Sequence, residues 1–381
     1  LISGKDAFEL YDTFGFPIDL TKEILSEKGM SVDEDRFRAL VLQQRETARA
    51  SRKNAGADAW AGDSAVLDDI AKTEFVGYTD MKATAKVTAI VKDGARVEAV
   101  ETGDDIVFTL DRTSFYAESG GQVGDTGVIT NDSCTIRVLD TTKNAAGVFI
   151  HKAVVEEGFL REGDTVEAVV DVERRRAIMR NHTAAHLLQA ALRSVLGDHV
   201  EQAGQLVNEN AVRFDFTHFS AVTPEELVEI GNQVSEMVLR GEPVETMVLP
   251  IAEAQKLGAT ALFGEKYGET VRVVKMGEDS LEFCGGTHLD NTAKVGPFRI
   301  LSEASVASGV RRIEAYTGKE VLRQTEQMSR LLLDIAHELK TTPKELMQRA
   351  HAMVGEVKEL KQRLDAMKDK LFSGEIARCL F

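Results

Sequence analysis

The sequence predicts a multidomain chain of the α+β class, and three observations support this. Its 381 residues are roughly two to three times the length of a typical single domain. The spacing of its apolar residues is helical at first, strand-like from about residue 73, and then mixed. The final segment carries a heptad pattern. We therefore expect four segments, which cover residues 1–72, 73–172, 173–318 and 319–381.

The first segment is predicted to be helical. Residues 6–11 and 20–24 have helical spacing, and Ser31 with Glu34 forms a capping-box pattern ahead of a longer helical run. Residues 53–63 are rich in Ala, Gly and Asp, and this composition predicts a linker.

The second segment is predicted to be a small β-barrel. Asp93-Gly94 is a strong hairpin signal, because both residue types tolerate the positive φ of a tight turn. Glycine turns separate several short strand patterns without intervening helices, which is typical of a barrel. The predicted strands cover residues 84–91, 96–100, 106–110, 135–139 and 166–170.

The third segment mixes the two periods and is predicted to be α+β. Its helices are expected at residues 179–196 and 224–240, the second of them introduced by Thr223. Strands are expected at residues 211–216 and 270–275.

The last segment predicts a helical hairpin with an exposed coiled-coil-like stripe. In Thr342-Pro343-Lys344-Glu345, Thr can cap a helix, Pro can take its first position and Glu can complete a capping box. The stripe indicates either packing of two helices within one chain or a homodimer formed through residues 319–381. Its apolar positions are Met328, Leu332, Ile335 and Leu339, followed by Leu346, Ala350, Met353, Val357, Leu360, Leu364, Met367 and Leu371.

Charge and cysteine content limit the partners and the compartment. The net charge of -16 argues against an extended nucleic-acid surface, so any phosphate contact must be local. Cys134, Cys284 and Cys379 are distant and odd in number, which argues against disulfides and predicts a reducing, cytoplasmic location. No apolar run is long enough to span a membrane. A start at Leu1 without Met predicts an excised piece of a longer protein.

Two pairs of residues predict a zinc site. His182 and His186 are four apart on a predicted helix, so both rings leave the same face. Cys284 and His288 are also four apart, and the two glycines between them allow a tight turn. Together the pairs supply four N/S ligands of the type that zinc prefers. Four protein ligands favour a closed structural site, whereas hydrolysis requires a position for water, and both interpretations stay open.

Two further motifs are candidates for contact with a phosphate-rich ligand. Residues 174–180 form the most concentrated basic run, which is either a solvated helix face or a docking surface for phosphates. Residues 116–125 are glycine-rich and form either a sharp barrel corner or a place where the backbone approaches a ligand closely. The candidate substrate-binding residues are Arg174, Arg175, Arg176, Arg180, Gly120, Gly121 and Gln122.

The order of these motifs resembles that of bacterial alanyl-tRNA synthetases over essentially the whole chain. Cys284-Gly285-Gly286-Thr287-His288 resembles the second half of that family's editing metal site, and residues 116–125 resemble its editing-barrel glycine motif. Further similar stretches are Tyr11-Asp12-Thr13-Phe14-Gly15-Phe16-Pro17, Val295-Gly296-Pro297-Phe298 and Gly309-Val310-Arg311-Arg312-Ile313.

The resemblance implies an editing domain that hydrolyses Ser-tRNA(Ala) and Gly-tRNA(Ala) and binds the acceptor end of tRNA(Ala). It implies Zn²⁺ at His182, His186, Cys284 and His288, and catalytic roles for the first three of these together with Gln202. ATP and Mg²⁺ would serve only the family's aminoacylation core, which nothing in this sequence resembles. The alternative is a non-catalytic tRNA-binding and dimerisation module with structural zinc.

Thr183 bears on the reaction in two ways. It stands where the zinc-protease motif has Glu, which disfavours a peptidase. Many family members also carry a hydroxyl residue at the position of Ala185, and here Thr183 supplies a hydroxyl on the same turn. The group that recognises the serine hydroxyl is therefore left open.

Overall fold

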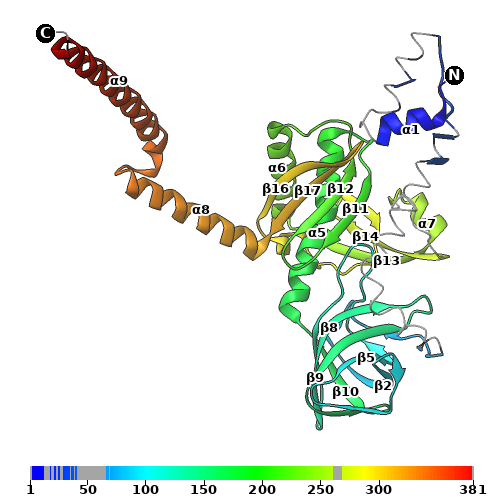
Figure 1. The fold of residues 1–381 in the computed structure, drawn as a ribbon. Coiled ribbons are helices and arrows are strands. Elements are labelled where there is room, and N and C mark those ends of the chain that lie inside the picture. Colours follow the sequence, from blue (N-terminus) through cyan, green and yellow to red (C-terminus); the bar gives the residue numbers. More distant parts are fainter. Residues whose placement is uncertain are drawn as a thin grey trace. The chain divides into compact units, whose positions relative to one another are not determined.

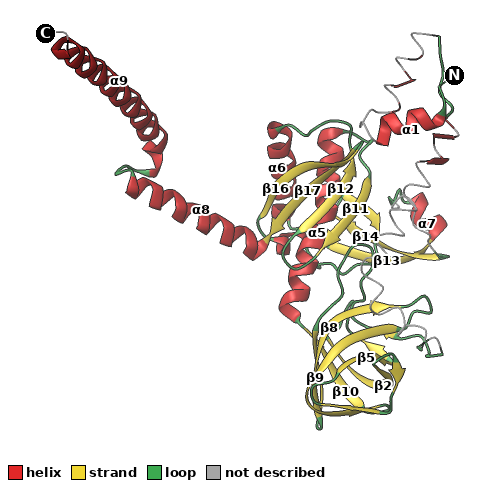
Figure 2. Ribbon diagram, viewed as in Figure 1, coloured by secondary structure: helices red, strands yellow, loops and turns green. Residues whose placement is uncertain are grey.

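The computed structural model describes residues 2–12, several positions between 18 and 40, residues 66–260 except 68, and residues 268–379. The chain divides into two compact units, Leu1–Gly318 and Lys319–Phe381. Helices and strands are both abundant, which confirms the predicted α+β class (Figures 1 and 2). None of the helices in the described ranges is long and apolar enough to cross a membrane.

The N-terminal part begins with helix α1 (Gly4–Asp12), at whose start the Ser3 hydroxyl accepts a hydrogen bond from the Asp6 backbone. Further along, the Asp33 carboxylate accepts a hydrogen bond from the backbone N–H of Arg36. The helix cap predicted at Ser31 is therefore wrong by two residues. The predicted linker at residues 53–63 and much of the predicted helix at 20–24 lie outside the described residues.

Six antiparallel strands close into a barrel, which confirms the predicted small barrel. Apolar side chains such as Phe108, Ile136 and Leu160 alternate inward and fill it. Asp93 and Gly94 both have positive φ, as the hairpin signal predicted. In hydrogen-bonding order the strands are β2 (Lys82–Lys92), β5 (Asp105–Leu110), β9 (Phe149–Arg161), β8 (Cys134–Lys143), β7 (Gly127–Asn131) and β10 (Thr165–Val170), which returns to β2. The short strands are β1 (Glu74–Phe75), β3 (Ala95–Arg96), β4 (Ala99–Glu101) and β6 (Arg112–Thr113).

A four-stranded antiparallel sheet packs against two helices to form the core that follows the barrel. Helix α5 (Val172–Leu196) begins at Asp171, whose side chain accepts the backbone N–H of Arg174. Helix α6 (Pro224–Arg240) begins at Thr223, which forms a reciprocal capping box with Glu226. The strands are β11 (Gln202–Val207), β12 (Val212–Thr217), β17 (Val310–Thr317) and β16 (Phe298–Ala307).

A second, three-stranded sheet leads into the loop that carries Cys284 and His288. Strands β13 (Val244–Pro250), β14 (Thr270–Met276) and β15 (Ser280–Phe283) pair in chain order. Helix α7 (Ile251–Lys256) follows β13, and the short 3-10 helix η1 (Thr292–Val295) follows the loop. Cys284 is the first residue after β15, so the sheet fixes where the loop begins.

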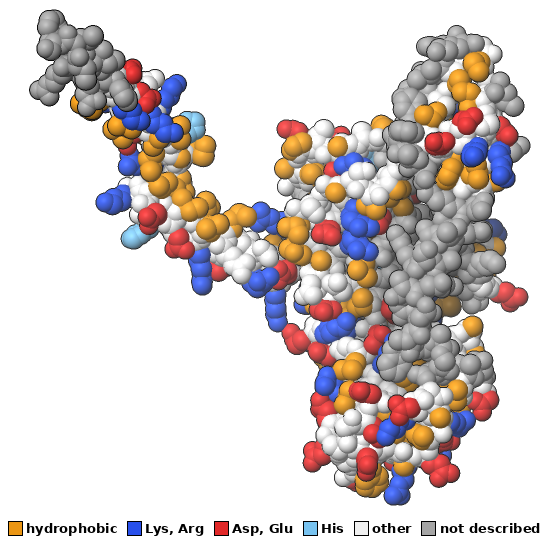
Figure 3. Space-filling model, in the orientation of Figure 1, with side chains coloured by type: hydrophobic (Ala, Val, Ile, Leu, Met, Phe, Trp, Pro, Cys, Tyr) orange, Lys and Arg blue, Asp and Glu red, His pale blue; other side chains and the backbone are white. Residues whose placement is uncertain are grey.

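The second compact unit consists almost entirely of two helices, α8 (Gly318–Glu338) and α9 (Leu346–Cys379), joined through η2 (Pro343–Glu345). The predicted hairpin is wrong for the described residues, because α8 and α9 do not pack along one another. Lys340 has positive φ at the end of α8, and the chain changes direction there without reversing. The apolar stripes of both helices therefore stay exposed (Figure 3).

Candidate metal centre

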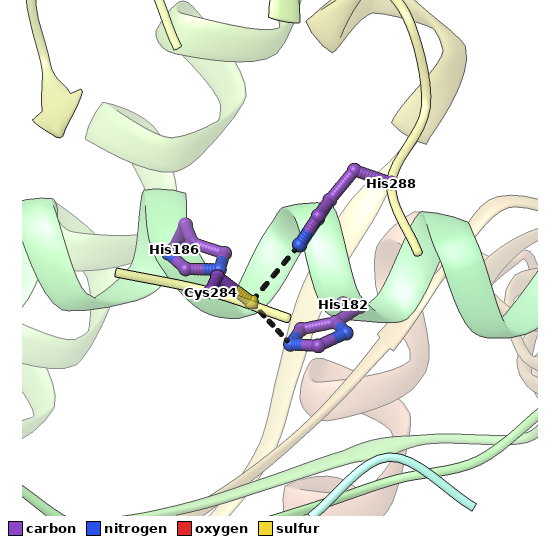
Figure 4. A group of neighbouring side chains, drawn as sticks. All are labelled: His182, His186, Cys284 and His288. Carbon is purple, nitrogen blue, oxygen red and sulfur yellow. Dashed lines mark hydrogen bonds between the residues drawn. The ribbon is translucent and has the colours of Figure 1, made fainter. Parts of the chain in front are cut away.

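Four side chains from two distant segments converge on one point. Helix α5 presents His182 and His186 one turn apart on the same face, and the loop after β15 presents Cys284 and His288 (Figure 4). Their candidate ligand atoms all lie within 4.8 Å of one another. The Cys284 sulfur is 3.2 Å from His288 Nε2 and 3.5 Å from His182 Nε2. The cluster can therefore hold a metal ion, as the two sequence pairs predicted.

Each of the three imidazoles has an outer partner at its Nδ1 atom. His182 Nδ1 lies 2.7 Å from the Gln122 side-chain oxygen. His186 Nδ1 lies 2.9 Å from the Glu282 carboxylate, and His288 Nδ1 lies 3.4 Å from the Thr183 hydroxyl. Metal-binding histidines usually hold their second ring nitrogen in this way, which orients the ring.

Charge within the cluster favours a thiolate. Burial would raise the pKa of the Cys284 thiol, but the His182, His288 and His186 imidazoles hold it well below its usual value. Burial lowers the pKa of His288 to about 3, so this ring is neutral near pH 7. Burial would also lower the pKa of His186, but Glu282 and Cys284 raise it to about 10. His186 must therefore release its proton when a metal binds, and a thiolate among three neutral imidazoles is a donor set that fits zinc.

A cavity of about 250 Å³ adjoins the cluster and is lined in part by His182 and Cys284. Gln205 and Gly120 line it on the side of the barrel loop, and Arg272 lines it from β14. Its volume lies below the roughly 300–1,000 Å³ of most small-molecule pockets. The cavity thus suits a small chemical group next to the metal centre better than a whole nucleotide.

Comparison with known proteins identifies the family. Residues 1–174 match the model of class II (A) tRNA synthetases, and residues 271–314 match the second additional domain of threonyl and alanyl tRNA synthetases. The alanine–tRNA ligase of Acetivibrio thermocellus is 48% identical over 377 residues, which are 99% of this chain and 43% of that protein. The chain belongs to the alanine–tRNA ligase family. The ligases of Pelotomaculum thermopropionicum and Clostridioides difficile are 48% and 47% identical over 92% of this chain and 40% of each protein.

The chain thus spans less than half the length of these alanine–tRNA ligases. The second matched region contains both Cys284 and His288, whereas His182 and His186 lie outside the two matched regions.

The glycine motif lies between the barrel and the metal centre. Gly121 has positive φ, which favours glycine. A Cβ atom there would overlap the backbone of Gln205 on β11, so the group that approaches Gly121 closely is protein backbone. Gly120 also has positive φ, but it lines the cavity and has open space where a Cβ would lie. Gln122 is fully buried and contacts a candidate metal ligand.

The four arginines of the basic run have different surroundings. Arg175 is buried and its guanidinium pairs with Asp125, which is a structural contact and differs from the phosphate-docking role expected for it. Arg174 donates to the Gly124 carbonyl at 2.8 Å, and Arg180 is half-buried. Arg176 keeps 58% of its side chain exposed.

Gln202, expected as a catalytic residue, does not line the cavity, although it begins β11. Gln205 lines it instead, where its side-chain amide donates to the Gly120 carbonyl at 2.7 Å and lies 3.4 Å from His182 Nε2. A bulge between Gln202 and Gly204 changes which side chains of β11 share a face. Gly204 lies at this bulge, and a glycine inside a strand is a common sign of one.

Sequence reasoning also missed a clamp on the metal-site loop. Arg272 donates to the carbonyls of Cys284 and Gly286 at 2.8 and 2.9 Å. Its guanidinium lies 4.3 Å from the centre of the Tyr78 ring, and the Tyr78 hydroxyl donates to Gly285 O at 2.6 Å. The loop between the two candidate ligands is therefore held by its backbone carbonyls.

Proposed function

We propose that this chain hydrolyses wrongly formed aminoacyl esters of tRNA(Ala), namely Ser-tRNA(Ala) and Gly-tRNA(Ala). The observation that carries the proposal is the convergence of His182, His186, Cys284 and His288 beside a small cavity. Membership of the alanine–tRNA ligase family supplies the substrate class. The cavity supplies a place for the aminoacyl group next to the cluster.

Selection among small amino acids explains why such a site is needed. A pocket that accepts alanine cannot exclude the smaller glycine by bulk, and it rejects an added hydroxyl only weakly. One missing or added small group changes binding by about 1–3 kcal/mol, which is too little for accurate protein synthesis. A second site that removes the wrong product by hydrolysis supplies the missing discrimination.

We assign the metal as zinc, held by His182, His186, Cys284 and His288. Zinc at such a site supplies Lewis-acid polarisation of an ester carbonyl or a bound water of lowered pKa. The Gln205 amide, held against the Gly120 carbonyl, is placed to contact the ester at the cavity wall. The exposed Arg176 offers a cation for phosphates of the acceptor end.

Thr183 is not the group that recognises the serine hydroxyl in this proposal. Its side chain is fully buried, and its hydroxyl accepts the backbone N–H of Leu289 and contacts His288. Its role is therefore to hold a metal ligand. A polar atom of the cavity wall, such as the Gln205 amide, is the better candidate for contact with serine.

Replacement of Cys284 by Ala tests the proposal. We expect the deacylation of Ser-tRNA(Ala) and Gly-tRNA(Ala) to fall by about 100-fold or more, because even outer-shell changes at metal sites cost about 10–100-fold. The zinc content, measured after dialysis, should fall as well. Ala-tRNA(Ala) should be a poor substrate of the unmodified chain.

Cys134→Ala is the matched control, because Cys134 is a free thiol buried in the barrel. This variant should retain activity and zinc. Deacylation by Cys284→Ala at the rate of Cys134→Ala would contradict the proposal.

A second candidate function is a non-catalytic tRNA-binding module with structural zinc. The observation that favours it is the number of protein ligands, since four would close a tetrahedral site. Stoichiometric zinc without hydrolysis of any of the three aminoacyl-tRNAs would establish this function and exclude the deacylase.

A further inference from the structure

Gln122 joins three segments of the chain that are far apart in sequence. It belongs to the glycine motif of the barrel, yet its fully buried side chain reaches helix α5 and the metal-site loop. Its side-chain oxygen lies 2.7 Å from His182 Nδ1 and accepts the backbone N–H of Thr287 at 2.9 Å. Its side-chain nitrogen donates to the Thr287 hydroxyl at 2.9 Å.

The orientation of this amide is fixed by its partners. A backbone N–H can only donate, so the Gln122 atom that faces Thr287 N must be the oxygen. The same oxygen faces His182 Nδ1, and an amide oxygen can only accept. His182 therefore carries its proton on Nδ1. Nε2 is then the ring nitrogen available to a metal ion, and it faces the Cys284 sulfur at 3.5 Å.

The space around the amide leaves this arrangement little freedom. Gly286 packs against both His182 and Gln122. A Cβ atom at this position would overlap the His182 ring and come within 2.9 Å of the Gln122 oxygen. On its other side, Gln122 forms a backbone bridge to Val207 at the end of β11. The amide is thus held by the barrel loop and by the core sheet together.

We propose that Gln122 is a positioning residue that sets the tautomer and ring orientation of His182, so that the metal affinity of the core depends on the barrel. This replaces the substrate-binding role expected for Gln122 from the glycine motif. The inference rests on the metal-binding part of the proposed function and is independent of whether the centre hydrolyses esters.

The test is metal affinity, measured on the full chain by Co²⁺ titration of the thiolate absorption and by Zn²⁺ competition with a chelator. Gln122→Met has a similar length but cannot accept from His182, and we expect its affinity to fall by about 10–100-fold. Gln122→Glu keeps an acceptor for His182 and for the Thr287 N–H. It should therefore bind metal at least as tightly as the unmodified chain.

Thr287→Val is the matched control, because it removes the hydrogen bond from the Gln122 nitrogen and leaves the acceptor for His182 in place. Its affinity should stay close to that of the unmodified chain. Normal affinity in Gln122→Met, or an equal loss in Thr287→Val, would overturn the inference. An unmodified chain that binds neither metal would instead overturn the proposed function, whereas tight binding without hydrolysis would leave the present inference standing.

A measurement on the unmodified chain does not depend on how the variants fold. Nitrogen-15 NMR of selectively labelled histidines reports which ring nitrogen of His182 carries the proton. We expect the proton on Nδ1 in the metal-free chain. A proton on Nε2 together with an unprotonated Nδ1 would overturn the inference.

Discussion

Gly285 and Gly286 are neighbours in the loop between two candidate metal ligands, but their surroundings differ. Gly285 is exposed, and a Cβ atom there would meet nothing within 4 Å. Gly286 is buried, and a Cβ atom there would occupy the space of the His182 ring. Neither glycine has a positive φ, so the difference between them is one of space and not of backbone conformation.

Gly286→Ala should therefore displace His182 and weaken zinc binding by about 10–100-fold, the effect of losing an outer-shell partner. It should also lower the free energy of unfolding by about 1–3 kcal/mol, which is typical of overpacking. Gly285→Ala, as the control, should bind zinc like the unmodified chain. Equal zinc affinity of the two variants, measured by chelator competition, would show that the loop can relax around the added methyl group.

The first turn of helix α5 is anchored to the barrel by one buried side chain. Arg175 Nε lies 2.8 Å from both Asp125 carboxylate oxygens. Its terminal nitrogens donate to the carbonyls of Gly77 and Ser114 at 2.8 Å. Removing one partner of a buried ion pair leaves the other charge uncompensated, which is more costly than losing a surface contact. The neighbouring Arg176 points to solvent and lies 3.8 Å from Glu173.

Arg175→Met should accordingly lower the free energy of unfolding by about 3–5 kcal/mol. Arg176→Met should change it by no more than about 0.5 kcal/mol, because it alters an exposed position. The second variant should instead weaken tRNA binding and reduce its dependence on salt. Denaturant unfolding and filter binding measure the two effects. A larger loss of stability in Arg176→Met would contradict both assignments.

The second compact unit exposes apolar surface on both of its helices. On α8 this surface includes Met328, Leu332 and Ile335. On α9 it includes Leu360 and Leu364, which are 61% and 53% exposed. Continuous exposed apolar stripes at heptad spacing are typical of helices that associate with another chain. We propose a second copy of this chain as the partner.

Light scattering should then give a mass of twice 41.8 kDa for the unmodified chain. The double substitution Leu360→Glu and Leu364→Glu places charges in the seam and should yield monomers. Lys361→Glu also introduces a negative charge on α9 but leaves these two seam residues unchanged, so it should remain a dimer. A monomeric unmodified chain, or dimers that persist in the double variant, would refute the association.

Local signals in the sequence predicted those features that local interactions create. Helix α6 begins at Thr223 as expected, because its capping box lies within four residues. The alternating barrel strand β10 and the continuously buried strand β5 were also predicted. Strand β9 was missed because Gly158 and the adjacent acidic residues interrupt its apolar pattern. The hydrogen bonds that hold it in the barrel come from other strands, and its own sequence does not show them.

The same difference between local and distant interactions applies to the candidate site. The spacing of each ligand pair is a local property, so the pairs could be found along the sequence. Their outer partners could not, since Gln122 lies 60 residues from His182 in the sequence. Gln205 was missed in favour of Gln202, because what distinguishes it is contact with Gly120 and His182, which are both distant in the sequence.

The bonds of Gln122 also have a consequence for folding. They connect a barrel loop, helix α5 and the metal-site loop, in which Thr287 lies 165 residues beyond Gln122. Contacts of such large sequence separation form late, because loop closure must precede them. We therefore expect the metal centre to be complete only after the barrel and the core have docked. A metal ion that binds this arrangement and not the unfolded chain adds its binding free energy to the stability of the fully assembled unit.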